Sequence, residues 1–157
     1  EYILNQQNGI INSPHIKYNQ ARWHRDLPYQ HFVTSKFIAI NVIYCIDKFT
    51  VENGCTIALP YSQLFENFPS NEFITYNQEP IIANPGDFII LNGMTFHKGG
   101  VNNSSDDRRA INSVYTIPFI RHQVDVTSLD YKYRLNSKDK KFLGFQYSSS
   151  KSLEKLL

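Results

Sequence analysis

Residues 36–46 of this 157-residue chain are the feature that most constrains its fold. After Lys36, every position of this run except Asn41 is apolar or aromatic. Such a run is typical of a strand buried on both faces, at the centre of a closed sheet or sandwich. A buried amide needs hydrogen-bond partners, so Asn41 must meet either neighbouring backbone or a ligand that faces the interior.

Shorter apolar runs separated by turn signals fill the rest of the chain, and no long stretch has helical periodicity. Short strands with turns roughly every 8–12 residues predict a mainly β fold, a sandwich or barrel with few short helices. Gly54 is expected to supply the positive φ of a tight turn. We expect strands at 2–4, 10–11, 16–26, 36–46, 55–59, 73–76, 80–83, 88–97 (kinked at 92–93) and 108–119, and one helical turn at 64–68.

Size and charge limit the number of domains and the kinds of partner. A chain of 157 residues suffices for one domain with one core. Its formal net charge of +2 gives no strong electrostatic preference for nucleic acid or membranes. No run of about 18 apolar residues is present. We therefore expect neither nucleic acid nor a membrane as a partner, and the sequence does not define an oligomeric state.

The two cysteines, Cys45 and Cys55, each lie in an apolar context and do not form a Cys-x-x-Cys pair. Small folds stabilised by disulfides usually carry more cysteines. Buried free thiols in a reducing compartment are therefore expected, which predicts a cytoplasmic location.

A pair of potential metal ligands stands at the end of the expected strand 16–26, in the tetrapeptide Trp-His-Arg-Asp. Residues two apart on a strand project to the same face, so His24 and Asp26 point together while Arg25 points away. Alpha carbons about 7 Å apart on one pleat can aim an imidazole and a carboxylate at one ion. Two ligands do not hold a first-row metal firmly, so a third must come from elsewhere in the chain.

A third potential ligand and a cation follow further along the chain. His97 ends the apolar run 88–97, and Arg108 and Arg109 begin the last expected strand. The order His-x-Asp, a distant His, then an Arg is that of a 2-His-1-carboxylate facial triad followed by an anion clamp. Such a triad leaves positions on Fe(II) open for a co-substrate and for O₂. Alternation along the strand lets only one of the two arginines point inward.

Four segments together resemble a known family. They are Trp-His-Arg-Asp at 23–26, Glu-Asn-Gly-Cys-Thr-Ile-Ala-Leu-Pro at 52–60, Pro-Gly-Asp-Phe-Ile-Ile-Leu at 85–91, and the segment from His97 to Ile111. In this order they resemble the phytanoyl-CoA dioxygenase family of Fe(II)/2-oxoglutarate oxygenases. The resemblance implies a double-stranded β-helix, the cupin-like jelly roll.

The resemblance also implies roles for individual side chains. His24, Asp26 and His97 would bind Fe(II) and form the catalytic centre. The family spacing between His and Arg selects Arg108 to bind the distal carboxylate of 2-oxoglutarate, with Arg109 as the alternate. A guanidinium suits this task because it can bind a carboxylate through two parallel hydrogen bonds.

Two asparagines complete the expected environment of the co-substrate. Asn41 is a candidate because it stands alone in an apolar strand. Asn102 and Ser104 stand where the family repeats Asn-x-Ser, and we expect them to brace the loop between metal and clamp.

The activity implied by the resemblance is hydroxylation of a small organic molecule. The enzyme would consume O₂ and 2-oxoglutarate and release succinate and CO₂. The carboxylate of Asp26 favours hydroxylation, because halogenases resembling this family carry a small residue there and so open a halide position. The sequence does not identify the substrate.

Three regions differ from the family pattern or lie outside it. In the family, residues Pro-Gly-Ser-His follow the strand that ends at Pro60; here the sequence is Pro-Tyr-Ser-Gln, and we assign no role to Gln63. Members usually carry helices ahead of the His-x-Asp strand, so we expect residues 1–157 to be a single oxygenase-like domain that lacks an N-terminal helical part. Residues 120–157 are expected to form a basic extension that packs on this domain, with a short helix at 151–157.

Other classes of protein fit parts of the same pattern. A zinc or manganese jelly-roll hydrolase or isomerase would use the same triad but has no use for an inward arginine. A non-catalytic binding domain would use the histidines as hydrogen-bonded core residues and would bind no metal. A third class is an oxygenase that acts on a nucleic acid or a protein. Those that act on nucleic acid usually add a second spaced arginine and a strongly basic groove.

Overall fold

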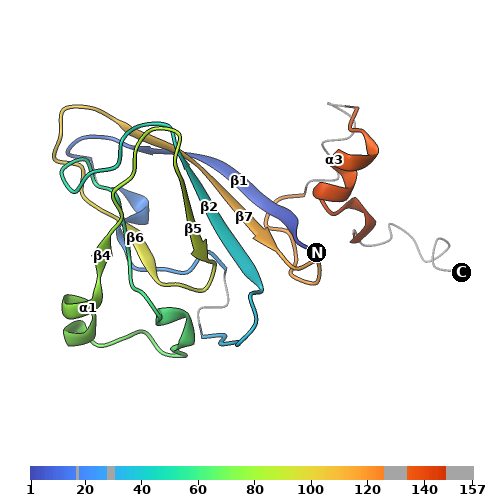
Figure 1. Cartoon of the computed structure of the whole chain (residues 1–157), viewed down its shortest axis with the longest axis horizontal. Helices are drawn as coiled ribbons and strands as arrows, with labels where there is room; N and C mark the ends of the chain where they lie inside the picture. The colour runs from blue at the N-terminus through green and yellow to red at the C-terminus, as the bar shows by residue number, and fades with distance from the viewer. Residues whose placement is uncertain (17, 28–30, 126–133, 148–157) are drawn as a thin grey trace, which may run out of the picture.

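The computed structural model describes residues 1–16, 18–27, 31–125 and 134–147, and two antiparallel sheets dominate it (Figure 1). The larger sheet has the strand order β1-β7-β2-β5 and the smaller sheet β4-β3-β6. The strands are β1 (Ile3–Asn12), β2 (Ala39–Cys45), β3 (Thr56–Ala58), β4 (Glu79–Pro80), β5 (Phe88–Asn92), β6 (His97–Gly99) and β7 (Arg108–Thr116). The described helices are α1 (Asn71–Asn77), α3 (Ser137–Phe142) and the 3₁₀ turns η1 (Asn19–Ala21), η2 (Ser62–Leu64) and η4 (Phe145–Tyr147). The predominance of strands confirms the predicted mainly β class.

Strand β7 lies inside the larger sheet, paired along its length with β1 on one side and β2 on the other. Its alternate residues Arg108, Ala110, Val114 and Thr116 are buried, whereas Arg109 is exposed. This is the alternation that the sequence predicts, and it turns Arg108 towards the smaller sheet.

An apolar cluster around Phe49, which is fully buried, occupies part of the space between the sheets. Cys45 and Cys55 both belong to this cluster and are free thiols. Smaller clusters lie around Met94 and around Phe96. Burial of a large apolar side chain contributes about 1.5–3 kcal/mol relative to exposure. These clusters therefore hold the two sheets together around a central cavity.

Strand β2 is buried on one face only, whereas the sequence predicts burial on both. Ala39, Asn41 and Ile43 are buried, but Tyr44 is 36% exposed, and Ile90 on neighbouring β5 is 67% exposed. The ring of Tyr44 packs on that of Phe88. An apolar run can reflect an apolar outer surface as well as burial on both faces, so composition alone does not separate the two cases.

Strand β1 is continuous from Ile3 to Asn12, where the sequence predicts two short strands separated by a turn. Polar residues between the apolar ends suggested the turn, but β7 offers a pairing partner along the whole segment. A β-bulge between Leu4 and Gln6 shifts the alternation. Before it, Ile3 is buried; after it, even-numbered residues such as Asn12 take the inward side.

Two expected strands change because of long-range pairing. The described residues between 16 and 26 do not form the predicted strand. They contain η1, and an isolated bridge joins His24 to His97. The run 88–97 is not one kinked strand either. It divides into β5 of the larger sheet and β6 of the smaller one, with a turn in which the amide of Thr95 donates to the carbonyl of Asn92. Local patterns do not encode such pairings.

Helix α1 occupies the place where the sequence predicts a strand at 73–76. The hydroxyl of Ser70 caps the helix by accepting a hydrogen bond from the amide of Phe73, and Glu72 lies in the first turn. Both features favour a helix start and prevail over the β preference of the aromatic and β-branched residues. The strand expected at 80–83 is reduced to β4, and the expected helical turn falls slightly earlier, in η2.

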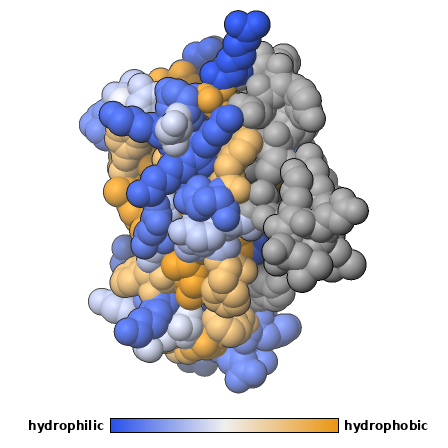
Figure 2. All heavy atoms as spheres, turned by 90° about the vertical axis from the view of Figure 1, so that its right-hand side faces the viewer, coloured by the Kyte–Doolittle hydropathy of each residue, from blue (hydrophilic) through white to orange (hydrophobic). Residues whose placement is uncertain are grey.

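The described part of the C-terminal segment lies against the end of the larger sheet, near the N-terminus (Figure 1). The ring of Phe142 contacts that of Tyr115 at 5.8 Å, and Nε2 of His122 donates to the carbonyl of Leu143 at 3.1 Å. Figure 2 shows hydrophilic side chains over much of this end, with smaller apolar areas between them. The helix predicted at 151–157 lies outside the described residues. None of the described helices has the length and apolar character needed to cross a membrane.

Candidate metal and co-substrate site

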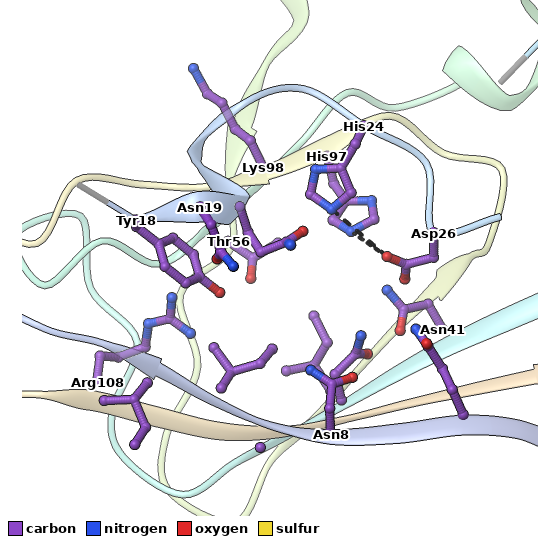
Figure 3. A pocket seen from close by; sticks show the side chains of 18 residues that line it. Asn8, Tyr18, Asn19, His24, Asp26, Asn41, Thr56, His97, Lys98 and Arg108 are labelled. Atoms are coloured by element: carbon purple, nitrogen blue, oxygen red, sulfur yellow. Dashed lines mark ion pairs between the residues drawn. The ribbon is translucent and has the colours of Figure 1, made fainter. Parts of the chain in front are cut away.

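Three potential metal ligands from two distant segments meet at one end of a cavity between the sheets (Figure 3). The donor atoms of His24, Asp26 and His97 lie within 4.8 Å of one another. Nε2 of His24 is 3.7 Å and Nε2 of His97 is 3.6 Å from Oδ1 of Asp26. The second carboxylate oxygen, Oδ2, has no hydrogen-bond partner among the described groups. The three side chains therefore fit the donor set of a 2-His-1-carboxylate iron site.

Backbone carbonyls fix the tautomer of both histidines. Nδ1 of His24 lies 2.7 Å from the carbonyl of Arg22, and Nδ1 of His97 lies 3.0 Å from the carbonyl of Thr95. A carbonyl oxygen only accepts, so each Nδ1 must carry the proton and donate. Each Nε2 then keeps its lone pair, directed towards Asp26. This is the usual arrangement of a histidine that binds a metal.

The surroundings shift the pKa of the two histidines in opposite directions. Burial, followed by repulsion from His97, lowers the pKa of His24. Burial also acts to lower the pKa of His97, but the hydrogen bond and the charge of Asp26 outweigh it, and the pKa is raised. Near neutral pH, His24 is therefore ready to bind a metal, whereas a proton competes for His97.

The backbone joins the two histidines directly. The amide of each donates to the carbonyl of the other, at 3.0 Å in both directions. On its other side, His97 pairs with Ala58 of β3. The two imidazoles therefore keep their relative position although their segments are far apart in the sequence.

The side chain of Arg25 anchors the segment that carries His24 and Asp26. Its side chain is only 3% exposed and points away from the other two residues of the His-Arg-Asp triplet, as the sequence predicts. The guanidinium donates to the carbonyls of Met94, Ser62 and Phe65 and lies 4.0 Å over the ring of Phe96. These contacts connect the His24–Asp26 segment to the turn that leads into His97.

Arg108 lies at the opposite end of the same cavity, on β7 (Figure 3). It is 1% exposed, its guanidinium lies 4.4 Å over the ring of Phe49, and Tyr18 lies nearby at 6.0 Å. Burial lowers the pKa of Arg108, but a guanidinium keeps its charge in proteins. Among the described residues, Nε of Arg108 has no hydrogen-bond partner and no acidic side chain forms an ion pair with Arg108. The cavity therefore holds a buried cation that can accept an anionic ligand.

Arg109, the alternate clamp, faces the other way. Its guanidinium binds both carboxylate oxygens of Asp47 at 2.9 Å, on the outer side of the sheet. The hydrogen bonds from Arg109 lower the pKa of Asp47. Of the two arginines, the structure places only Arg108 in the cavity.

The cavity between the two ends has a volume of about 280 Å³ and contains further unsatisfied polar groups. Asn41 is fully buried, and neither atom of its amide has a partner among the described groups. Figure 3 shows this amide beside Asp26. Oδ1 of Asn112 on β7 is also buried without a partner. Because unsatisfied buried amides are costly, both residues are suited to contact a ligand.

Asn102, by contrast, does not line this cavity. Its amide donates to the carbonyls of Asn12 and Asp106, and its oxygen accepts from the amide and hydroxyl of Ser104. These bonds hold the loop before Arg108 in place. This geometry agrees with the expected bracing role of Asn102 and Ser104. It does not agree with direct contact between Asn102 and a co-substrate in the cavity.

Residues 60–63, which depart from the family pattern, have a structural role. Tyr61 adopts a left-handed conformation with φ of 65°, at the position where the family has glycine. The hydroxyl of buried Ser62 accepts from the amide of Phe96, next to His97. Gln63 does not line the cavity.

Several cavity residues escaped the sequence analysis. Tyr18, Thr56 and Asn112 also line the cavity, and Gln6 and Asn8 line it from β1. The inward alternation of β7 could have identified Asn112 from its spacing to Arg108. Gln6 and Asn8 could not be found in this way, because the bulge in β1 determines which way they point.

This fold and these clustered donors define a jelly-roll protein with a candidate 2-His-1-carboxylate metal site. A family model described as Phytanoyl-CoA dioxygenase (PhyH) matches residues 4–110. The chain therefore belongs to the phytanoyl-CoA dioxygenase family, as the resemblance predicts.

Two curated relatives illustrate how much of a longer protein the chain matches. Uncharacterized protein Rv1501 of Mycobacterium tuberculosis is 31% identical over 131 residues, which cover 78% of this chain and 46% of the relative. Dioxygenase andF of Emericella variicolor is 35% identical over 102 residues, which cover 63% of this chain and 32% of the relative. The chain thus spans less than half the length of either relative.

Solved structures share the fold. EvdMO1 superimposes with a TM-score of 0.62 at 23% identity, covering 75% of this chain and 28% of EvdMO1. The epimerase SnoN, in complex with Fe³⁺, alpha ketoglutarate and nogalamycin RO, gives a TM-score of 0.61 at 18% identity, covering 82% of this chain and 56% of SnoN. These similarities confirm the predicted jelly roll.

Proposed function

We propose that this chain is an Fe(II)- and 2-oxoglutarate-dependent dioxygenase that hydroxylates a small organic molecule. Arg108 is the observation that carries the proposal. It is a buried cation with no acidic partner among the described residues, and it shares one cavity with the His-Asp-His group. A buried charge without a counter-ion is costly, and the carboxylate of a co-substrate would offset that cost.

In this proposal, His24, Asp26 and His97 hold Fe(II), and the carbonyls that accept from each Nδ1 keep the imidazoles in orientation. Arg108 binds the distal carboxylate of 2-oxoglutarate and so directs the keto acid towards the metal end. Asn41 provides amide hydrogen bonds beside Asp26. When bound, iron and 2-oxoglutarate supply the oxidising chemistry, in which O₂ is consumed and succinate and CO₂ are released. A cytoplasmic location and a single-domain organisation remain predictions.

Anaerobic titration of the purified chain with Fe(II) and then 2-oxoglutarate tests the proposal. A weak visible metal-to-ligand charge-transfer band should appear only when both are present, and admission of air should then yield succinate. Metal binding that does not respond to 2-oxoglutarate would instead favour a zinc or manganese hydrolase or isomerase. Absence of metal binding would favour a non-catalytic binding domain and contradict the proposal.

A further inference from the structure

A second recess, of about 470 Å³, adjoins the metal end of the cavity. Every described residue that lines it has a polar or charged side chain. Its lining includes the carboxamide side chains of Gln6, Asn8, Asn19, Gln20 and Gln123. Ligand pockets are usually lined mostly by apolar side chains, so this composition is informative about the ligand.

The fold directs these carboxamides towards the metal position from two sides. Gln6 and Asn8 come from β1, where the bulge after Leu4 sets their direction. Asn19 and Gln20 come from η1, which precedes the segment that carries His24 and Asp26. In Figure 3, Asn8 lies on the floor of the cavity and Asn19 faces it, with the His24–Asp26–His97 group to one side.

Four of these carboxamides are available for a ligand, whereas Nε2 of Gln123 donates to the carbonyl of Asp26. The side chains of Gln6, Asn8, Asn19 and Gln20 make no hydrogen bond with any group in the described part of the chain. The neighbouring Gln7, which does not line either cavity, donates to Ser113 instead. On β1, the carboxamides of Gln6 and Asn8, which face the recess, are therefore free, whereas that of Gln7 is engaged.

The recess offers little charge besides the metal ligands. The guanidinium of Arg25 is directed into the protein, where it donates to the carbonyls of Met94, Ser62 and Phe65. This leaves Arg22 as the only other charged lining residue within the described chain. Each carboxamide offers two donors and an acceptor, which match the dual character of hydroxyl groups. A hydrocarbon chain that displaced water from these carboxamides would leave them without hydrogen-bond partners.

We propose that the substrate is a small, neutral, polyhydroxylated compound, such as a sugar or a glycoside, whose hydroxyls bind Gln6, Asn8, Asn19 and Gln20. This inference rests on the proposed oxygenase function. One C–H bond of the substrate becomes C–OH with one oxygen atom of O₂, and the other oxygen atom enters succinate as CO₂ leaves. The substrate carbon and 2-oxoglutarate each lose two electrons, and O₂ takes up four.

Ligand-observed NMR on the purified chain tests the substrate class. The probes are a panel of neutral monosaccharides and their methyl glycosides, and a second panel of straight-chain alcohols of similar size. Measurements are made with the metal-free chain and with the chain loaded with Ni(II) and 2-oxoglutarate, which does not turn over. We expect a sugar or glycoside to bind more tightly than every alcohol. Replacing Gln6 and Asn8 together by Leu should weaken that binding at least about tenfold, because two hydrogen-bonding groups are lost.

Gln7→Leu is the matched control, because the same residue type on the same strand faces away from the recess. It should leave sugar binding unchanged, and thermal unfolding of each variant checks that the fold is intact. The substrate class is overturned if no sugar binds, if alcohols bind better, or if the Gln6 and Asn8 variant binds like the wild type. Binding of Ni(II) and 2-oxoglutarate in the same samples separates this failure from that of the oxygenase proposal. Sugar binding without any metal or 2-oxoglutarate binding would contradict the oxygenase function alone.

Discussion

The two ends of the cavity are built in different ways. Arg108 stands on β7, a nine-residue strand that is hydrogen-bonded on both sides within the larger sheet. His24 and Asp26 lie outside any regular strand, and His97 begins the three-residue strand β6. The arginine end is therefore held by a regular ladder, whereas the metal end depends on a few specific contacts. Such an end should be the more sensitive of the two to loss of a single partner.

The largest effect should come from removing the carboxylate at the metal end. Asp26→Ala is expected to weaken binding of Fe(II), measured anaerobically by competition with a chromophoric chelator, by more than about 100-fold. This corresponds to about 3 kcal/mol, the share of one ligand in a typical protein metal site. Asp107→Ala, which removes an exposed carboxylate next to Arg108, should leave metal binding unchanged. Equal affinities in the two variants would rule out the assignment of Asp26.

At the other end, Arg108→Met should weaken binding of 2-oxoglutarate about 10- to 100-fold while metal affinity stays the same. The expected size follows from hydrogen bonds to a charged group, which contribute about 1.5–3 kcal/mol. Calorimetry with the Ni(II)-loaded chain measures both affinities. Arg109→Met is the matched control, since its guanidinium binds Asp47 on the outer face and should not affect the co-substrate. A reversed result would exchange the roles of the two arginines.

Replacement of Arg25 tests whether the metal end of the cavity depends on a few specific contacts. Arg25→Met removes the donors to three backbone carbonyls, and we expect the free energy of unfolding in urea to fall by about 2 kcal/mol. Metal affinity should fall in the same variant, because the segment carrying His24 and Asp26 loses its anchor. Arg121→Met, which alters an exposed arginine, serves as the control. Unchanged metal binding in a destabilised Arg25 variant would show that the ligands are held independently of it.

The smallest expected effect is the pH dependence of metal binding, at most about tenfold per pH unit for one competing proton. Because the pKa of His97 is raised, metal binding must release a proton from His97 at pH values where an ordinary histidine is already neutral. Affinity for Ni(II) should therefore increase as pH rises above the ordinary histidine range. In the metal-free chain the same shift stabilises the fold below the unfolded pKa of this histidine, and the stabilisation is lost as pH rises through the folded pKa. Calorimetry in two buffers with different ionisation enthalpies counts the released protons, and a count of zero would contradict the prediction.

The sequence predicted the regular end of the site better than the irregular one. Alternation along β7 predicted that one of the two adjacent arginines would point inward, and the family spacing selected Arg108. The residue types of the metal group were also anticipated, but not the structure around them, because a single bridge to His97 replaces the expected strand. The carboxamides of β1 were missed since a bulge sets their direction. Bridges and bulges depend on contacts between distant segments, which local patterns do not record.

An anaerobic crystal structure of the chain with Fe(II) and 2-oxoglutarate, located by the anomalous signal of iron, tests the central claim most directly. We predict one iron at about 2.1 Å from Nε2 of His24, Nε2 of His97 and a carboxylate oxygen of Asp26. The distal carboxylate of 2-oxoglutarate should lie on the guanidinium of Arg108, across the same cavity. Iron bound elsewhere, or a co-substrate that leaves Arg108 without an anionic partner, would contradict the account.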